Sequence, residues 1–384
     1  MLSHQFDKSL WAIVEFGNVV ENKNESSKNP ASEGLTRVVG LDDMDPESLP
    51  LRRWNEIGDL PDGTTFTRKF SSGQVLFGKR RSYQKKVSVP DFDGVCSGDI
   101  LVFEAKNKKM LNKFLPLVVQ SADFMSHAIA TSAGSLSPRT KWSDLAKYQF
   151  CLPSLKDQEK IIEIISSIDR TIEAYQDLPL ETQRESMLHE LLSEGGDDWT
   201  ETTLGEVSSF ISRRVLPNDL ALETQYVGLE HVEPMTTLIS TWGNVESVSS
   251  SVTPFEPEDT LFGRLRPYLH KVAFADFPGV CSPEILVLRT SAICEPRFLY
   301  LLCSLASTVK KCVDMSAGTR MPRTSAADLA SIEVYLPPLA EQKRIVEIVS
   351  SMDEAIRATK QAIRDLKVLR GSLLTEILPV NDNG

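Results

Sequence analysis

Apolar residues recur with heptad spacing over the last part of the chain, which predicts a long helix. Their spacing of three and four residues is the pattern of a coiled-coil seam, interrupted by Thr359 and Arg370. A helix over residues 338–378 would be about 60 Å long at ~1.5 Å per residue. The seam consists of Ile345, Val349, Met352, Ile356, Ile363, Leu366, Leu373 and Ile377.

A second seam lies in the middle of the chain and predicts a related helix. Ser154 is a candidate N-cap, and Asp157 falls in the first turn, where a carboxylate complements the helix dipole. Pro179 interrupts this seam, and because proline removes a helical hydrogen bond, we predict a kink or two segments there. The seam comprises Ile161, Ile165, Ile168, Ile172 and Tyr175, and resumes at Met187, Leu188, Leu191 and Leu192.

The two seams need apolar surfaces to cover them. We predict that the helices pair as an antiparallel coiled coil; the alternative is that each seam packs into the core of its neighbouring domain. The remaining sequence holds short Val- and Thr-rich runs broken by Gly, Pro and Asn, the pattern of strands. Apolar residues clustered at 110–131 and 297–313 have helical spacing. Each domain is therefore predicted to be α+β.

The chain is a tandem duplication. Residues 76–97 read LFGKRRSYQKKVSVPDFDGVCS, and residues 261–282 read LFGRLRPYLHKVAFADFPGVCS, at an offset of 185. The starts of the two helices, LPSLKDQEKIIEIISSID and LPPLAEQKRIVEIVSSMD, match at an offset of 184. A repeat of this length predicts two similar domains, each followed by its own helix, in a pseudo-twofold arrangement. We expect domains at 1–153 and 195–336, a first spacer helix at 154–194, and a second spacer helix with a C-terminal tail at 337–384, with a hinge at Gly195 and Gly196.

Composition places the chain among globular proteins. It has 384 residues, 41% of them hydrophobic and 25% charged, and it contains neither an apolar run of membrane-spanning length nor a secretory signal. We therefore predict a cytoplasmic protein without a membrane partner. The six cysteines form no CxxC pair, which favours buried thiols over a metal site. The formal charge of −11 argues against nucleic-acid binding for the chain as a whole, but local charge is more informative.

Basic and aromatic residues alternate directly after each Leu-Phe-Gly. Guanidinium groups can bind phosphates or the edge of guanine, and a tyrosine ring can stack on a base, so these loops are candidate DNA contacts. The alternative is a solvated loop whose charges balance acidic neighbours. The candidates are Lys79, Arg80, Arg81, Tyr83, Lys85 and Lys86 in the first copy, and Arg264, Arg266, Tyr268, His270 and Lys271 in the second.

A second cluster also occurs in both copies. The segments SAGSLSPRT at 132–140 and SAGTRMPRT at 316–324 are rich in Gly and Ser and carry Arg139, Arg320 and Arg323. Such a loop can present backbone N–H groups and arginines to a phosphate. A turn that links two helices is the structural alternative.

One pattern resembles the acidic site of metal-dependent nucleases. Asp91 after Pro90, followed by Glu104 and Lys106, could bind Mg²⁺ and position a water. The second copy has Arg289 and Ser291 where the first has Glu104 and Lys106, which disfavours catalysis. The sequence contains no P-loop, no nucleophile elbow and no dinucleotide fingerprint. It also lacks the Asn/Asp-Pro-Pro-Tyr motif of amino-methyltransferases, and its histidines show no metal-ligand spacing.

The order domain, helix, domain, helix and the opening LPPLAEQKRI of the second helix resemble the specificity (S) subunits of type I restriction-modification systems. The resemblance covers nearly the whole chain. It implies two target recognition domains that read the two halves of a bipartite asymmetric DNA site, held apart by antiparallel helices. The two basic clusters fit the positions where such domains meet DNA. Pro179 departs from an unbroken first helix, and Ser82 stands where the second copy has Pro267, so we expect the first loop to sit differently.

The resemblance also implies partners. The chain would be non-catalytic and need no cofactor of its own. It would direct two modification subunits, which use S-adenosylmethionine to methylate adenine, and ATP-driven restriction subunits that need Mg²⁺. The modification subunits would dock on the conserved helices and nearby domain surfaces.

Two other functions remain open on the residues alone. A protein-only adaptor with paired helices would suit the acidic net charge, and a solitary Mg²⁺-dependent nuclease would use Asp91, Glu104 and Lys106.

Overall fold

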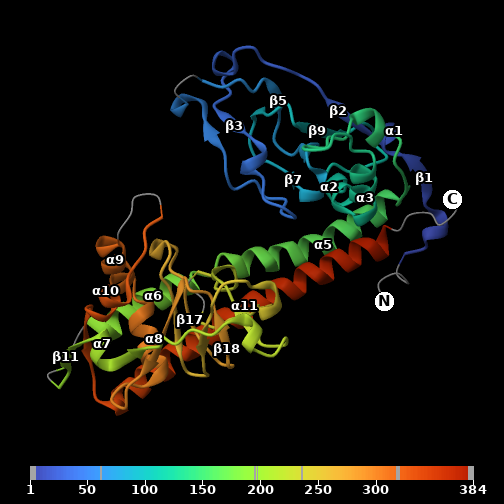
Figure 1. The fold of residues 1–384 in the computed structure, drawn as a ribbon. Coiled ribbons are helices and arrows are strands. Elements are labelled where there is room, and N and C mark those ends of the chain that lie inside the picture. Colours follow the sequence, from blue (N-terminus) through green and yellow to red (C-terminus); the bar gives the residue numbers. More distant parts are fainter. Residues whose placement is uncertain are drawn as a thin grey trace. The chain divides into compact units, whose positions relative to one another are not determined.

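The protein, seen in a computed structural model, divides into two compact units (Figure 1). Unit one comprises Met1–Asp177 and Gln361–Gly384, and unit two comprises Leu178–Lys360. The structure describes residues 6–60, 63–193, 196, 198–234, 237–316 and 321–378. Gly195, part of the predicted hinge, lies outside these ranges.

Unit one is built on short strands. Within the described residues its strands form a two-stranded pair and two four-stranded sheets, in which β3 and β8 run parallel and the other pairings are antiparallel. The pair is β1 (Ala12–Glu15) with β10 (Gln149–Leu152). One sheet has the order β2 (Val20–Lys23), β9 (Ile100–Ala105), β6 (Val75–Gly78), β7 (Val87–Ser88). The other has the order β4 (Asn55–Glu56), β3 (Arg37–Val39), β8 (Gly94–Cys96), β5 (Arg68–Phe70).

In the part of unit one that the structure describes, four short α-helices accompany these strands. The helical spacing at residues 110–131 is confirmed by α2 (Leu115–Gln120) and α3 (Ala122–Ala130), and the others are α1 (Phe16–Val19) and α4 (Trp142–Leu145). Fully buried phenylalanines from α1, α3 and the sheet meet in the core, where the rings of Phe16 and Phe103 lie 5.5 Å apart. Aromatic burial of this kind stabilises the small α+β domain.

Unit two repeats this plan. Strand order is the same in every sheet, and β13 and β18 form the parallel pair. Its strands are β11 (Thr200–Thr203) with β20 (Glu333–Leu336); β12 (Ser208–Phe210), β19 (Ile285–Thr290), β16 (Thr260–Gly263) and β17 (Val272–Phe274); and β14 (Gly243–Asn244), β13 (Gln225–Val227), β18 (Gly279–Cys281) and β15 (Thr253–Phe255). Its helices are α7 (Leu204–Val207), α8 (Pro296–Ser304), α9 (Ala306–Met315) and α10 (Ala326–Ala330).

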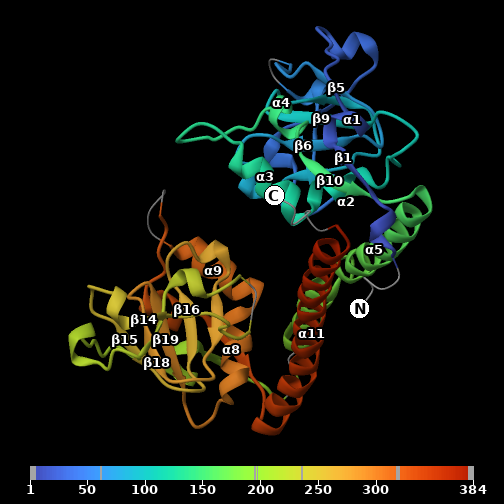
Figure 2. The ribbon, with the colours of Figure 1, turned by 90° about the vertical axis from the view of Figure 1, so that its right-hand side faces the viewer.

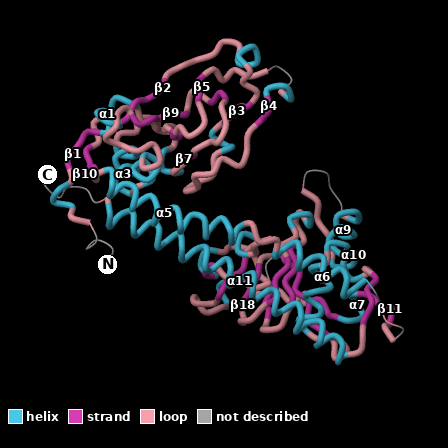
Figure 3. Tube along the Cα trace, turned by 180° about the vertical axis from the view of Figure 1, so that it is seen from behind, coloured by secondary structure: helices cyan, strands magenta, loops and turns pink. Residues whose placement is uncertain are grey.

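The second helical prediction, at residues 297–313, is confirmed by α8 and α9. Helix α8 packs against β16, β17 and β19 (Figure 2). Both units therefore mix short strands with helices, as the sequence predicted (Figure 3). The shared glycine of each GVCS segment has a packing reason, because a Cβ on Gly94 or Gly279 would lie 2.7 or 2.8 Å from a neighbouring strand's carbonyl oxygen.

Helices form along both heptad seams. Helix α11 runs over Leu339–Ile377, so residues 339–360 belong to unit two and residues 361–377 to unit one. The first seam forms α5 (Leu155–Gln176) and α6 (Leu180–Ser193), with Pro179 directly before α6. Proline cannot donate the backbone hydrogen bond that would continue α5, and it is well accepted at a helix start. Ser154 caps α5 as predicted, since its Oγ accepts a hydrogen bond from the Asp157 N–H at 3.2 Å.

The helices pair in antiparallel fashion within each unit. In unit two, Glu181 pairs with Lys360 at 3.2 Å and Arg184 pairs with Asp353, so partner numbers fall along α11 as they rise along α6. In unit one, Arg370 Nε of α11 lies 2.6 Å from Asp169 Oδ1 of α5, and later residues of α11 up to Ile377 share a core cluster with the earlier Ile161 and Ile165 of α5. The seams also contribute to the domain cores, so the alternative packing occurs together with the predicted pairing.

A buried glutamine ties each domain to its long helix. Gln158 in α5 accepts a hydrogen bond from Leu111 N–H at 2.9 Å and donates to the carbonyls of Lys109 and Pro153. Gln342 in α11 makes the same three bonds, to Glu295, Ile293 and Pro337. Both side chains are completely buried. The glutamine of the repeated helix motif therefore has a structural role as a clamp.

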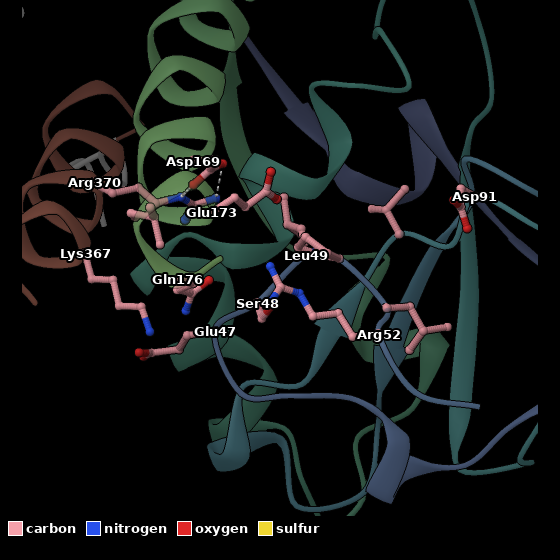
Figure 4. Close-up of a pocket in the computed structure, with 14 residues that line it drawn as sticks. Glu47, Ser48, Leu49, Arg52, Asp91, Asp169, Glu173, Gln176, Lys367 and Arg370 are labelled. Atoms are coloured by element: carbon pink, nitrogen blue, oxygen red, sulfur yellow. Dashed lines mark hydrogen bonds and ion pairs between the residues drawn. The ribbon is translucent and has the colours of Figure 1, made fainter. Parts of the chain in front are cut away.

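The two units differ where the domain meets its helices. In unit two, Thr237 Oγ1 donates to Asp353 Oδ2 at 2.8 Å, and Tyr300 donates to Thr237 at 3.3 Å. In unit one, Leu49 holds the position of Thr237, since its carbonyl accepts a bond from Val89 as that of Thr237 does from Phe274. A cavity of about 360 Å³ remains there, between residues 47–52 and the Asp169–Arg370 pair (Figure 4).

Candidate nucleic-acid interface

In unit one, three segments that are distant in sequence meet at the loop after β6. Lys79 N–H donates to the Asp99 carbonyl at 3.0 Å, directly beyond the GVCS segment. Arg81 N–H donates to Pro138 O at 2.7 Å, and Thr140 N–H donates to Lys79 O at 3.0 Å. The two candidate clusters of the first copy therefore form one surface, joined by backbone hydrogen bonds.

Unit two builds the same junction. Arg264 N–H donates to the Glu284 carbonyl at 2.9 Å, and Arg266 N–H donates to Pro322 O at 2.8 Å. Thr324 N–H donates to Arg264 O at 3.0 Å, which completes the equivalent set. The same backbone frame thus presents different side chains in the two units.

Both loops fold through the same unusual backbone conformation. Arg81 and Lys85 have φ of 54° and 51° on either side of a 3₁₀ turn at Ser82–Gln84. Arg266 and His270 have φ of 52° and 51° around the turn at Pro267–Leu269. Such a conformation costs about 1–3 kcal/mol for a residue other than glycine, and it is typical of binding sites.

The expectation that the first loop sits differently is wrong. The backbone angles agree although Ser82 replaces Pro267, and both residues are buried. Ser82 Oγ donates to the Lys79 carbonyl at 3.3 Å, a local bond that helps to hold the turn without proline.

A carboxylate orients one arginine in each interface, a feature that the sequence analysis missed. Arg139 donates to both oxygens of Asp99 at 2.8 and 3.2 Å, and Arg323 donates to both oxygens of Glu284 at 3.0 Å. The hydrogen bond from Arg139 lowers the pKa of Asp99, so the carboxylate stays charged. A bidentate pair fixes the plane of the guanidinium. The retained acid, Asp99 in one copy and Glu284 in the other, was the available signal.

Other candidate DNA contacts lie on the same loops as these two carboxylate–arginine pairs, which we call forks. Tyr83 and Tyr268 have 55% and 54% of their surface exposed, so both rings are available for stacking. Arg80 Nη1 lies 3.5 Å from Asp99, while its Nη2 donates to Ser137 Oγ at 3.2 Å. Arg266 is exposed, and Arg81 and Arg264 are half-buried.

Four other candidates are engaged within the chain. Lys86 Nζ donates to Leu41 O at 2.7 Å, and Lys271 Nζ donates to Leu229 O at 2.6 Å. His270 Nε2 lies 2.7 Å from Ser304 O, and Lys85 pairs with Glu47 at 2.6 Å on the surface. Lys86, Lys271 and His270 thus hold their loops against neighbouring backbone.

The second cluster of unit one forms the predicted turn, and Arg139 lies on it. Ala133 and Arg139 exchange backbone hydrogen bonds at 3.0 and 2.9 Å, so the segment is a turn between α3 and α4 that also presents Arg139. In unit two Arg323 is placed, whereas Arg320 lies outside the described residues.

Glu104, one of the three nuclease-like residues, occupies a cross-strand position with structural partners. Glu104 accepts a hydrogen bond from Gln74 at 3.1 Å and pairs with Lys23 at 3.1 Å. At the same place in unit two, Arg289 pairs with Asp259 at 2.7 Å. Either pair stabilises the sheet. Within the described ranges, no three His, Cys, Asp or Glu side chains gather as a metal-ligand set would.

The cysteines of the repeated GVCS segments are buried thiols, as predicted. Burial raises the pKa of both Cys96 and Cys281 to about 12, which keeps them protonated and unreactive. In the described part of the chain, no helix is both long and apolar enough to cross a membrane.

The sequence matches one family model twice. The model is described as a type I restriction modification DNA specificity domain, and it matches residues 13–183 and 196–368. The two matches follow the two copies of the repeat.

Two curated specificity subunits match parts of this chain, and a solved structure shares its fold. The EcoDI type I restriction enzyme specificity subunit of Escherichia coli is 25% identical over 158 residues, 41% of this chain and 35% of that subunit. The HindI specificity subunit of Haemophilus influenzae is 26% identical over 190 residues, 46% of this chain and 40% of that one. The matches thus span less than half of either relative. The crystal structure of a type I restriction-modification S subunit from M. genitalium shares the fold, with a TM-score of 0.57, 18% identity and 96% coverage of both chains.

Proposed function

The chain belongs to the type I restriction modification DNA specificity family, and from this premise we propose that it is the subunit that reads the DNA sequence for a modification and restriction complex. Each unit contacts one half of a bipartite site. Because the loops of the two units differ in side chains, the two half-sites differ and the whole site is asymmetric.

One observation supports this proposal above the others. The same backbone junction occurs in both units, yet the side chains on it are KRRSYQKK in one and RLRPYLHK in the other. A pure scaffold has no reason to keep a strained loop and vary its charged residues, whereas a reader of two sequences does. Direct readout depends on which side chains reach the base edges.

The proposed contacts are the side chains free to face DNA. Arg139 and Arg323, held flat by their carboxylates, suit bidentate recognition of guanine or phosphate. Tyr83 and Tyr268 can stack on bases or contact phosphate and sugar groups. Lys86, Lys271 and His270 hold the loops in place through their bonds to backbone carbonyls. The proposed set is Arg80, Arg81, Tyr83 and Arg139 in unit one, and Arg264, Arg266, Tyr268 and Arg323 in unit two.

The chain itself performs no chemistry in this proposal. The structural pairing of Glu104 in one unit and Arg289 in the other supports this view. Modification subunits supply methyl transfer from S-adenosylmethionine, and restriction subunits supply the ATP- and Mg²⁺-dependent steps. The long helices and adjacent domain surfaces receive the modification subunits, and the complex acts on chromosomal DNA in the cytoplasm.

A gel-shift titration tests the proposal. The full chain, alone and with its cognate modification subunit, is expected to bind duplex DNA at low salt and to lose affinity steeply as salt rises. Absence of binding under both conditions would leave the adaptor function instead. Mg²⁺-dependent cleavage by the purified chain, abolished by Glu104→Ala, would replace the proposal with the nuclease function.

A further inference from the structure

In the described part of unit one, several cationic side chains lie near one carboxylate, that of Asp99. Arg139 and Arg80 approach Asp99 at 2.8 and 3.5 Å. Lys79 and Arg68 complete the group, since the charge of Lys79 interacts with both Arg68 and Asp99. Among the described residues, Arg139, Arg80 and Lys79 therefore share the Asp99 carboxylate, an excess of two positive charges, and Arg68 adds its charge beside Lys79.

Unit two lacks two of these cations at equivalent positions. Thr253 opposes Cys281 in its sheet as Arg68 opposes Cys96, so Thr253 replaces Arg68. Leu265 bridges to Arg323 as Arg80 bridges to Arg139, so Leu265 replaces Arg80. Arg323 pairs with Glu284, while Arg214, from another part of unit two, is the cation that acts on Cys281 as Arg68 acts on Cys96. The cations of unit two are therefore arranged differently.

The extra arginines of unit one have unused hydrogen-bond donors. In the described structure, Arg68 Nη1 and Arg80 Nε are buried without a partner. Arg264 Nε in unit two is also unpartnered, but Thr253 and Leu265 add no guanidinium there. Burial lowers the pKa of Lys79, and the charges of Arg68 and Arg139 lower it further, so the charged form of Lys79 is disfavoured at this position. An anion from outside the chain would relieve both costs.

We propose that Arg68, Lys79 and Arg80 form a phosphodiester-binding site in unit one, in an arrangement of cations that unit two does not repeat. The inference rests on the proposed DNA-binding function and assigns the backbone-anchoring role to one unit. A phosphodiester is the anion that fits, because it carries one negative charge and several acceptor oxygens and occurs at every nucleotide. Phosphate contacts fix position and affinity without reading sequence. The phosphate contact thus adds to the DNA affinity of unit one, whatever the sequence of its half-site.

The structure supplies its own test variant. Arg68→Thr combined with Arg80→Leu places the residues of unit two into unit one, whose frame is already known to accept them in the other copy. A matched control, Lys108→Thr with Lys113→Leu, removes two exposed positive charges from the same unit, between β9 and α2. The reciprocal variant Leu265→Arg adds one guanidinium to unit two.

The measurement is the affinity of the full chain, with its modification subunit, for a duplex of mixed sequence at several salt concentrations. Each lost phosphate contact lowers the slope of log K against log salt by about 0.9. We expect the double variant to lose about one such step, the control to keep the wild-type slope, and Leu265→Arg to gain slope.

Three results would overturn the assignment. The first is a wild-type slope in the double variant, and the second is an equal loss of slope in the control. The third is an unchanged slope with relaxed sequence preference at one half-site, which would make Arg80 a base reader. If the wild-type chain binds no DNA, the proposed function itself fails. If the double variant unfolds on heating below the wild type, Arg80→Leu alone carries the same test, because Arg80 is half-buried at the surface.

Discussion

The two units have the same backbone fold and differ in the side chains that it carries. The strand orders, the buried glutamine clamp and the carboxylate–arginine fork occur in both. The exposed and half-buried cations differ, most clearly where Arg68 and Arg80 become Thr253 and Leu265. Duplication has kept the parts that fix the loop and varied the parts that face outward. This is the pattern expected when one fold must recognise two different sequences.

The units also differ in how the domain meets its helices. Unit two closes the contact with a buried network of Arg184, Asp353, Thr237 and Tyr300, whereas unit one leaves a cavity beside Asp169 and Arg370. A buried network is costly to break because each remaining partner loses its hydrogen bond in a low-dielectric setting. The stability of unit two should therefore depend more strongly on the Arg184–Asp353 pair than the stability of unit one depends on the Asp169–Arg370 pair.

The largest effect is expected from breaking that pair. Arg184→Ala leaves the Asp353 carboxylate buried without its cation, which should cost about 3–5 kcal/mol of unfolding free energy. Arg370→Ala should cost clearly less, because Asp169 is 30% exposed and water can solvate it. Hydrogen exchange resolved by peptide measures each unit separately. Equal losses of protection in the two units would contradict the comparison, and Arg344→Ala, at an exposed pair on α11, serves as the control.

The glutamine clamp should affect both units alike. Gln158→Ala and Gln342→Ala each remove three hydrogen bonds from a completely buried site, with an expected cost of about 2–3 kcal/mol. Urea unfolding followed by hydrogen exchange should show the loss in the unit that carries the change. The exposed Gln183→Ala in α6 should leave stability unchanged. A strong effect in one unit only would mean that the clamp is not equivalent in the two copies.

The arginine forks should act on separate half-sites. Arg139→Ala should weaken binding roughly ten- to a hundredfold through the unit-one half-site, and Arg323→Ala should do so through the other, as expected for loss of a bidentate contact. Competition with duplexes mutated in one half-site at a time separates the two effects. Loss that is independent of which half-site is intact would assign both arginines to general phosphate binding.

The smallest effect concerns pH. The folded-state pKa of Lys79 is below its usual value, so its positive charge is lost earlier as the solution becomes alkaline. Arg264, at the equivalent place in unit two, stays charged throughout that range. DNA affinity should therefore begin to fall at a lower pH for the wild type than for Lys79→Arg. Identical pH profiles of these two proteins in binding assays would exclude a contact by Lys79.

The sequence predicted the elements better than their junctions. Heptad spacing located α5, α6 and α11, and Pro179 marked the break, because these are local patterns. Asp99 and Arg68 were missed as parts of the interface. A backbone hydrogen bond joins Asp99 to Lys79, and sheet pairing places Arg68 opposite Cys96, and no local spacing predicts either contact. Gln158 was noted only as part of the repeated helix motif, and its structural role was not predicted, because its burial follows from tertiary contacts. Lys86 and His270 show the converse, basic residues whose partners are backbone carbonyls.

The central claim is that two units of one fold read two half-sites independently. Sequencing the methylated genome of cells that carry the wild-type gene, no gene, or the Arg264→Ala, Arg266→Ala variant tests it most directly. We expect a bipartite methylation motif that depends on the gene, with only one half relaxed by the variant and with the other half and the spacing between them unchanged. Relaxation of both halves together, or methylation that does not depend on the gene, would contradict the account.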